Sequence, residues 1–253
     1  SKWGEGYPGW HIECTAMSTK YLGENFDIHT GGIEHISIHH TNEIAQGFAA
    51  FGKQTANYWL HNGWLTGKGG EKMSKSLGNY VTAQELVEKG YDPIAMRYLI
   101  LTSHYKKGLR FSFESLDSAQ SALNNLRGLV FASKSENERT ILSEDKNQKI
   151  NDFRESFVKS LSDDINVPQA LAVLWEVMKS NIPSQDKYDL AISFDEVLGL
   201  DLLKIKNSSI PYNIKKLMEE RIKLRSAKKF EEADKIRDKI VKLGYEVTDQ
   251  PTK

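Results

Sequence analysis

Helical periodicity over residues 114–198 constrains the fold of this chain more than any other feature of its sequence. Apolar residues recur there at steps of three and four positions, which places them on one face of an α-helix. The first such stripe consists of Leu116, Ala119, Leu123, Leu126 and Val130. Helices with a single apolar stripe can bury it only against one another. The sequence therefore predicts an all-α helix bundle in the middle of the chain.

The first hundred residues show a different pattern, in which short strands alternate with helices. Residues 26–29 read as a buried strand that is broken by Thr30, Gly31 and Gly32, and residues 57–65 read as a second strand. A strand that leads into a glycine pair brings the backbone close to a nucleotide in α/β folds. We therefore expect a partial Rossmann-type α/β domain at this end of the chain.

The composition is that of a globular protein in water, because hydrophobic residues make up 39% of the 253 positions and charged residues 27%. No apolar run approaches the roughly 18 residues of a membrane span, and no cleavable signal opens the chain. The single cysteine excludes an internal disulfide, which fits a reducing compartment. We therefore expect a cytoplasmic monomer that makes no contact with membranes.

A lysine loop follows the second strand. Lys72 and Lys75 lie three positions apart, separated by small residues and preceded by the glycine-rich run 66–70. A lysine ammonium is a compact charge on a flexible stem, so such a loop can close over a polyphosphate and follow its negative charge. A solvated surface turn is the alternative interpretation of the same residues.

Three further residues offer a set of metal ligands. His39 and Glu43 are spaced i, i+4 on a predicted helix, so their side chains point to the same spot. With Cys14 they supply an imidazole, a carboxylate and a thiolate, the ligand types that zinc binds. A buried cysteine and a surface His–Glu pair would fit these residues equally well. Spacing alone also leaves open the pairs His11–Cys14 and His40–Glu43.

These motifs together resemble the cysteinyl-tRNA synthetases, a family of class I aminoacyl-tRNA synthetases. The resemblance lies in GYPGWHIEC at residues 6–14, FDIHTGG at 26–32, HHTNEIAQ at 39–46, KMSKS at 72–76 and DDINVPQA at 163–170. It extends through most of the chain, with the motifs in the family's order. It implies an ATP-dependent ligase that activates L-cysteine as cysteinyl-adenylate and transfers it to tRNA(Cys).

The resemblance also implies roles for particular residues near the amino acid. Cys14, His39 and Glu43 are expected to bind Zn²⁺, and Trp10 is expected to help form the pocket for the cysteine side chain. Zinc that binds the substrate thiolate would distinguish cysteine from serine, because oxygen is a poorer ligand than sulfur for a borderline-soft ion. The metal would then determine the specificity of the protein for cysteine over serine.

A second set of implied roles concerns ATP, which is expected with Mg²⁺. The resemblance places His29, Gly31, Gly32 and Glu34 near the adenosine of ATP or of the adenylate. Glu34 departs from the family, which more usually has Asp at this position, so its carboxylate reaches further.

In the lysine loop, Lys72 and Lys75 are expected to stabilise the pyrophosphate as it leaves. Cysteine activation needs positioning and charge stabilisation more than acid or base groups.

We expect three domains. Residues 1–110 would be the later part of a class I catalytic domain with its KMSKS loop, and residues 111–206 the helix bundle. Residues 207–253 would form a small α+β domain with two helices and a strand at 245–247. Its basic helices resemble the anticodon-binding domain of the same family, in which Lys and Arg neutralise phosphates.

The resemblance further implies that this chain is a portion of a longer protein. It starts at Ser1, with no strand or helix before the first motif. The family's HIGH motif and a fourth zinc ligand are expected before this point, so the chain alone is expected to be unable to form cysteinyl-adenylate. Two alternatives remain. One is a ligase that joins cysteine to an amino sugar, as in mycothiol biosynthesis, and the other is a non-catalytic tRNA-binding module.

Overall fold

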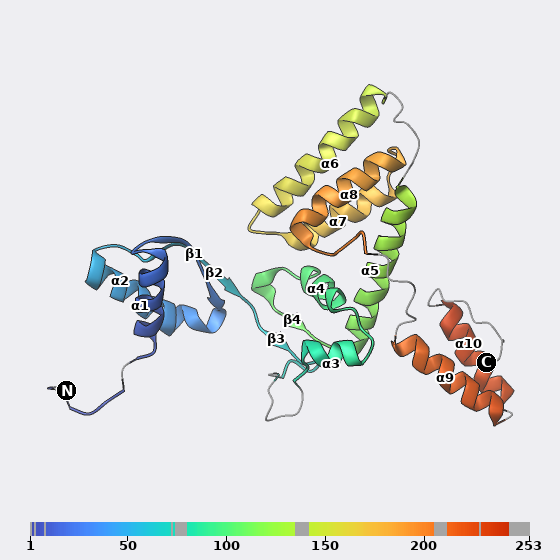
Figure 1. Ribbon diagram of the computed structural model, residues 1–253, viewed down its shortest axis with the longest axis horizontal. Helices are drawn as coiled ribbons and strands as arrows, with labels where there is room; N and C mark the ends of the chain where they lie inside the picture. The colour runs from blue at the N-terminus through green and yellow to red at the C-terminus, as the bar shows by residue number, and fades with distance from the viewer. Residues whose placement is uncertain are drawn as a thin grey trace. The chain divides into compact units, whose positions relative to one another are not determined.

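The computed structural model describes residues 2, 4–7, 9–71, 73, 80–134, 142–204, 212–227 and 229–242. The chain forms two compact units (Figure 1). The first unit consists of Ser1–Met73 and Ser103–Phe111, and the second of Ser74–Thr102 and Ser112–Lys253. Within the described residues, no helix combines the length and the apolar character needed to cross a membrane. The division into domains 1–110, 111–206 and 207–253 stays a prediction.

The first unit is built on a parallel pair of strands. Helix α1 (His11–Leu22) ends at Gly23, and β1 (Phe26–Gly32) follows it. The chain then passes through a 3₁₀ turn, η1 (Ile33–His35), and a π-helical turn, η2 (Ile36–His40), into α2 (Thr41–Phe51). Strand β2 (Ala56–Asn62) returns beside β1 in parallel. This crossover through a helix is the connection that parallel strands require.

The strand bounds differ from those expected from the sequence. Gly31 and Gly32 continue β1 instead of breaking it, because they pair with His61 and Asn62 in the parallel ladder. The second predicted strand divides into two, since the chain turns at Gly63 and β3 (Leu65–Thr66) pairs with β4 (Leu109–Arg110). A Cβ at Gly63 would lie 2.3 Å from the backbone nitrogen of Gly108, so only glycine permits this close approach.

The interior of the first unit is polar. Its described residues include two buried hydrophobic side chains, Ala56 and Phe111. The buried polar residues of the unit are His11, Thr15, His39, His40, Glu43 and Thr55. One face of the strand pair is open, since the cross-strand neighbours Ile28 and Tyr58 are 56% and 68% exposed. Parallel strands are normally covered on both faces, so this unit lacks a covering layer.

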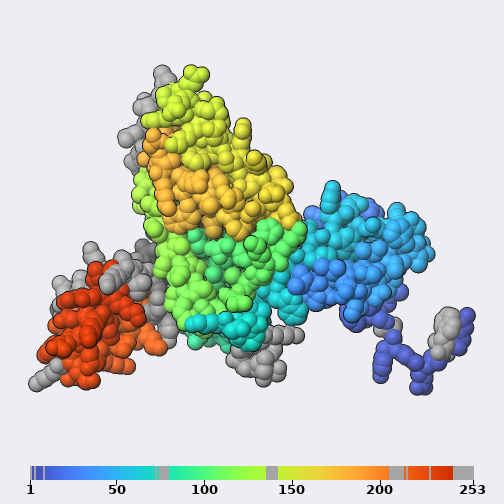
Figure 2. Space-filling model, turned by 180° about the vertical axis from the view of Figure 1, so that it is seen from behind, coloured from blue at the N-terminus to red at the C-terminus, as the bar shows by residue number. Residues whose placement is uncertain are grey.

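The second unit contains the predicted bundle. Within the predicted range 111–206 the structure has α5 (Phe113–Ser133), α6 (Glu144–Ser162), α7 (Val167–Lys179) and α8 (Ser184–Leu198). Helices α3 (Ala83–Glu88) and α4 (Pro93–Leu101) precede this range in the same unit. All five residues of the predicted stripe in α5 are buried, which confirms the helical bundle. Figure 2 shows the side chains of α6 to α8, coloured yellow to orange, closing against one another. The fold class therefore agrees with the sequence-based expectation.

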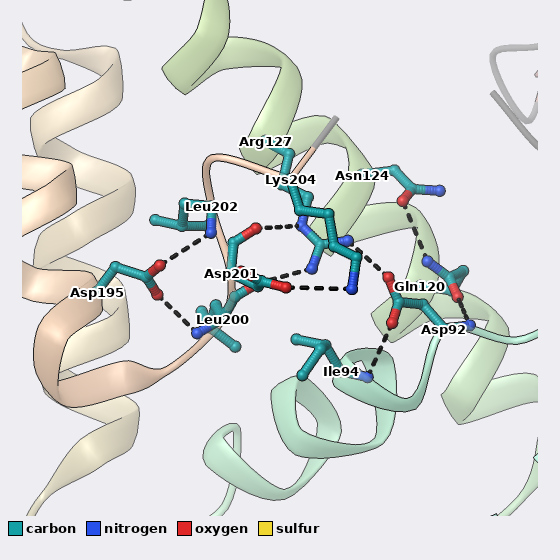
Figure 3. A network of polar contacts seen from close by, with 10 residues as sticks. All are labelled: Asp92, Ile94, Gln120, Asn124, Arg127, Asp195, Leu200, Asp201, Leu202 and Lys204. Atoms are coloured by element: carbon teal, nitrogen blue, oxygen red, sulfur yellow. Dashed lines mark hydrogen bonds and ion pairs between the residues drawn. The ribbon is translucent and has the colours of Figure 1, made fainter. Parts of the chain in front are cut away.

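Helix α4 belongs to this bundle through a buried polar network (Figure 3). Asp92 caps α4 by accepting a hydrogen bond from the backbone N–H of Ile94. Arg127 on α5 donates to Asp92 Oδ2 at 2.8 Å and to the carbonyl oxygens of Leu200 and Asp201 at 2.8 and 3.0 Å. The segment that follows the lysine loop is thereby attached to the bundle.

The end of the chain forms a helical hairpin. Helices α9 (Tyr212–Ser226) and α10 (Phe230–Lys242) pack against each other and bury Ile214, Ala233 and Ile240. The strand expected at residues 245–247 lies outside the described residues.

Candidate metal centre

Three elements of the first unit bring the predicted metal ligands together. Cys14 lies on α1, His39 in the π-helical turn, and Glu43 in the first turn of α2. One ligand atom of each residue, the Cys14 sulfur, a His39 ring nitrogen and a Glu43 oxygen, lies within 4.8 Å of the other two. His39 Nε2 is 2.8 Å from Glu43 Oε1. The i, i+4 spacing therefore has the geometric result expected from the sequence, although the role of the residues in zinc binding stays a prediction.

Glu43 is the centre of this arrangement. Its side chain is fully buried, and neither carboxylate oxygen accepts a hydrogen bond of acceptable geometry. Burial raises the pKa of Glu43 to about 7. A buried carboxylate without hydrogen bonds is costly unless a cation or a proton compensates it. The donor set of sulfur, nitrogen and oxygen fits a zinc ion, with one coordination position left for another ligand.

His39 is oriented by a second imidazole. The Nδ1 atoms of His11 and His39 are 2.7 Å apart, so one ring donates a hydrogen bond to the other and His39 Nε2 is directed at Glu43. Burial, followed by the charge of His11, lowers the pKa of His39, which favours the neutral imidazole that metals bind. Of the residues in the pairs left open by the sequence, His11 is a hydrogen-bond partner of His39, and His40 lies with Glu43 in a second set of potential ligands.

In the absence of a cation, the surroundings of Cys14 favour the protonated thiol and not the thiolate that binds metals. Burial, followed by the negative charges of Glu43 and Glu13, raises the pKa of the Cys14 thiol. A coordinated cation reverses this effect, because a thiol bound to a metal loses its proton. Trp10 stands beside the site, its indole stacked on the His39 ring at 5.6 Å between centroids and 55% exposed.

A second set of potential ligands shares Glu43. A nitrogen of His29, a nitrogen of His40 and an oxygen of Glu43 also lie within 4.8 Å of one another. His40 Nδ1 is 2.7 Å from His61 Nε2. Sequence reasoning did not assign a role to His61, although one signal was available, since six of the seven histidines lie between residues 11 and 61.

The residues expected near the nucleotide lie at the carboxyl end of β1. His29 faces Glu43, with Nε2 3.4 Å from Oε2, and packs against Trp59. Gly31 leaves room for the His40 ring, and the carboxylate of Glu34 lies against Gly32, where a Cβ would meet it. His29 and Gly31 therefore adjoin the metal centre, through Glu43 and His40 respectively, while Glu34 lies against Gly32.

Lys72 and Lys75 lie outside the described residues. The glycine-rich run before them is described as far as Glu71, whose carbonyl oxygen accepts a hydrogen bond of 2.9 Å from the backbone N–H of Gly67. The structure therefore does not test the lysine loop.

Comparison with known proteins first identifies a class. Residues 1–121 match the family described as "tRNA synthetases class I (C) catalytic domain". A solved structure of a LeuRS from Agrobacterium radiobacter, in a ternary complex with tRNA and LeuAMS, shares the fold at a TM-score of 0.51 and 15% identity. It covers 69% of this chain, and the match covers 25% of that chain. Residues 1–121 are therefore similar to the catalytic domain of class I tRNA synthetases, and the solved structure shares the fold.

The curated relatives are cysteine–tRNA ligases. This chain is 46% identical to cysteine–tRNA ligase 1 of Burkholderia lata over 253 residues, which are 99% of this chain and 52% of the relative. It is 42% identical to the cysteine–tRNA ligase of Caldicellulosiruptor saccharolyticus over 99% of this chain and 57% of that relative. Over 99% of its length the chain is therefore similar to cysteine–tRNA ligases. It spans about half the length of the curated relatives it matches.

Proposed function

We propose that this chain is part of a cysteine–tRNA ligase and that Cys14, His39 and Glu43 hold a zinc ion that binds the thiolate of the substrate cysteine. The observation that carries this proposal is the fully buried Glu43 carboxylate, whose oxygens accept no hydrogen bond and lie beside the Cys14 thiol and the His39 imidazole. Zinc supplies a Lewis acid that binds sulfur better than oxygen. Sites that depend on a specific bond reject analogues lacking it by about 10⁴ or more.

The surrounding residues position the amino acid. The exposed indole of Trp10, stacked on His39, offers an apolar wall next to the ligands, against which the short side chain of cysteine can pack. The hydrogen bond between His11 and His39 holds the His39 ring in place and selects its tautomer. These residues would thereby orient the thiol of the substrate cysteine toward one edge of the first unit.

The nucleotide would bind at the carboxyl end of β1. The adenosine would lie beside the backbone of Gly31 and Gly32, with His29 and Glu34 next to it. The cysteine carboxylate forms a bond to the α-phosphorus of ATP, and the bond from that phosphorus to the oxygen of the departing pyrophosphate breaks. Lys72 and Lys75, together with Mg²⁺, neutralise the charge on the departing group.

The hairpin of α9 and α10 is proposed to bind tRNA(Cys) through its lysines and arginines. We further propose that the protein acts as a cytoplasmic monomer. Because the first unit has an open sheet face and the chain spans about half of its relatives, we infer that activation requires polypeptide beyond these 253 residues. That polypeptide would include the part of the relatives that this chain does not match.

Cobalt substitution tests the metal centre directly. We expect the Co²⁺-loaded chain to show a thiolate-to-cobalt charge-transfer band that Cys14→Ser and His39→Ala abolish. Cysteine should strengthen the band as a second thiolate binds, whereas serine should not. The matched control is His104→Ala, which removes the histidine that lies outside the 11–61 segment. A band that persists in Cys14→Ser, or that responds equally to serine, would contradict the proposal.

Binding of tRNA separates the ligase from the amino-sugar alternative. We expect the chain to bind tRNA(Cys) and to lose most of this affinity when residues 211–253 are deleted. A ligase for an amino sugar should ignore tRNA in both forms. Exchange of pyrophosphate into ATP, measured with and without the missing part of a relative, then separates the ligase from a non-catalytic tRNA-binding module.

A further inference from the structure

A second set of potential ligands shares Glu43 with the proposed zinc site. It consists of His29, His40 and Glu43, which offer two imidazoles and one carboxylate and no sulfur. His40 is 3% exposed and Glu43 is fully buried. His29 is partly buried, with its side chain 18% exposed. Burial of such groups around one point is expensive unless they share a cation or a complete set of hydrogen bonds. Among the described residues this set of hydrogen bonds is incomplete, because neither oxygen of Glu43 has a donor with suitable geometry.

The distances within this set fit a shared ion better than a hydrogen bond. His29 Nε2 and Glu43 Oε2 are 3.4 Å apart, which exceeds the usual N–H···O separation of about 2.9 Å. Two ligands bound at about 2.05 Å to one tetrahedral ion are separated by about 3.3 Å. The other oxygen, Oε1, faces His39 at 2.8 Å. The two oxygens of one carboxylate are therefore directed at two different imidazoles.

His40 is oriented as a metal ligand usually is. Its Nδ1 lies 2.7 Å from His61 Nε2, so Nδ1 is occupied by a hydrogen bond and Nε2 is left as the ligand atom. The space beside Nε2 is kept open by Gly31, where a Cβ would stand 2.9 Å from this nitrogen and 2.6 Å from Cε1. An outer imidazole thus sets the direction of the inner one, as in many metal sites.

We propose that His29, His40 and Glu43 bind a second divalent cation and that the Glu43 carboxylate bridges it to the ion held by Cys14 and His39. The nitrogen and oxygen ligands suit Zn²⁺, Co²⁺ or Ni²⁺, since imidazole is the main donor. Two ions bridged by one carboxylate lie about 3.5–4 Å apart in known two-metal sites. This second site follows from the histidine cluster and does not depend on ligase activity.

Counting bound ions tests the second site. The complete 253-residue chain is freed of metal with a chelator and dialysed against Co²⁺ alone, and the bound metal is measured by elemental analysis together with the thiolate-to-cobalt band. We expect two ions per chain. His40→Ala should retain one ion with the thiolate band, and Cys14→Ser should retain one ion without it. Glu43→Gln should weaken both, and His104→Ala should bind two.

One ion in the unmodified chain, with a count that His40→Ala leaves unchanged, would overturn the proposal. Loss of all bound metal in Cys14→Ser would also overturn it, because the second site contains no sulfur. If circular dichroism shows that His40→Ala does not fold, Gly31→Ala replaces it. The added methyl group would displace the His40 imidazole from its position without removing it from the chain. Two tightly bound ions in Gly31→Ala would then contradict the assignment. The thiolate band reports the first site separately, so failure of one site is distinguishable from failure of the other.

Discussion

Arg127 Nη1 donates to Asp92 Oδ2 at 2.8 Å, and the two side chains are only 5% and 3% exposed. This ion pair connects α5 to the N-terminus of α4, the second helix after the lysine loop in sequence. The remaining donors of Arg127 bond to the carbonyl oxygens of Leu200 and Asp201, so the guanidinium joins three segments of the bundle (Figure 3). Buried pairs of this kind are costly to break, because the remaining partner is left without compensation.

Replacement of Arg127 by Met should destabilise the second unit by about 3–5 kcal/mol, because Asp92 would keep a buried charge and two carbonyl oxygens would lose their donor. Denaturant unfolding followed by circular dichroism measures this change. Lys204→Ala is the matched control in the same network. Its pair with Asp201 is about half exposed at 3.2 Å and should contribute less than about 1 kcal/mol. Equal effects of the two substitutions would contradict the structural role given to Arg127.

Stability should depend on pH through Asp117. Burial raises the pKa of Asp117 above its ordinary value of 3.8, although the hydrogen bond from Tyr91 opposes this shift. A carboxyl group whose pKa is raised by folding favours the folded state most when it is protonated, so its contribution is lost as pH rises through the folded pKa. Residue 117 cannot ionise in Asp117→Asn, so the variant should gain stability relative to the unmodified chain as the pH rises above about 4, the ordinary pKa range of an aspartate.

Unfolding measured at intervals across that range checks the Asp117 prediction. Asp152→Asn, at an exposed position on α6, is the matched control for replacing a carboxyl group by an amide. A stability difference for Asp117→Asn that stays constant with pH would show that the Asp117 carboxyl group is not responsible.

Under the proposed function, the open face of the β1–β2 pair should bind the part of the relatives that this chain does not match. Ile28 and Tyr58 are cross-strand neighbours on that face. Tyr58→Ser should weaken the association with the missing part, since each large apolar side chain contributes about 1.5–3 kcal/mol when fully buried. The stability of the chain alone should change by less than about 0.5 kcal/mol, as at other surface positions.

Isothermal titration of the two polypeptides measures this association. Val197→Ser on α8, an equally exposed position in the second unit, provides the comparison and should leave the affinity unchanged. Equal affinity for the Tyr58→Ser and unmodified chains would rule out this face as the contact surface.

Lys75 should matter for the chemical step. In the ligase reconstituted with its missing part, Lys75→Ala should slow pyrophosphate exchange by about 10²-fold, the usual effect of removing one group that stabilises developing charge. The Michaelis constant for cysteine should change little, because the lysine would act on the phosphates. Lys68→Ala in the same loop tests whether charge alone suffices, and it should have a small effect on the rate. Comparable losses for the two variants would indicate a general electrostatic role for the loop.

Local patterns predicted a large part of the fold. The capping box of Thr82 and Glu85 and the Asp92 cap are local features, because each depends on residues two or three positions apart. The bundle was readable from the apolar stripe of α5. The extension of β1 through Gly32 was not readable, because glycine is a weak strand former and only pairing with β2 keeps it extended.

The candidate site also combines features that the sequence predicts with features that depend on the tertiary structure. The sequence alone determined the i, i+4 relation of His39 and Glu43, because helical geometry is local. Only the tertiary structure decided that Glu43 would be buried without hydrogen bonds, and that His29 and His40 would face it from a second side. The burial of a charge and the meeting of side chains from β1, β2, α1 and α2 depend on packing between elements distant in the chain. No spacing within one element encodes that packing.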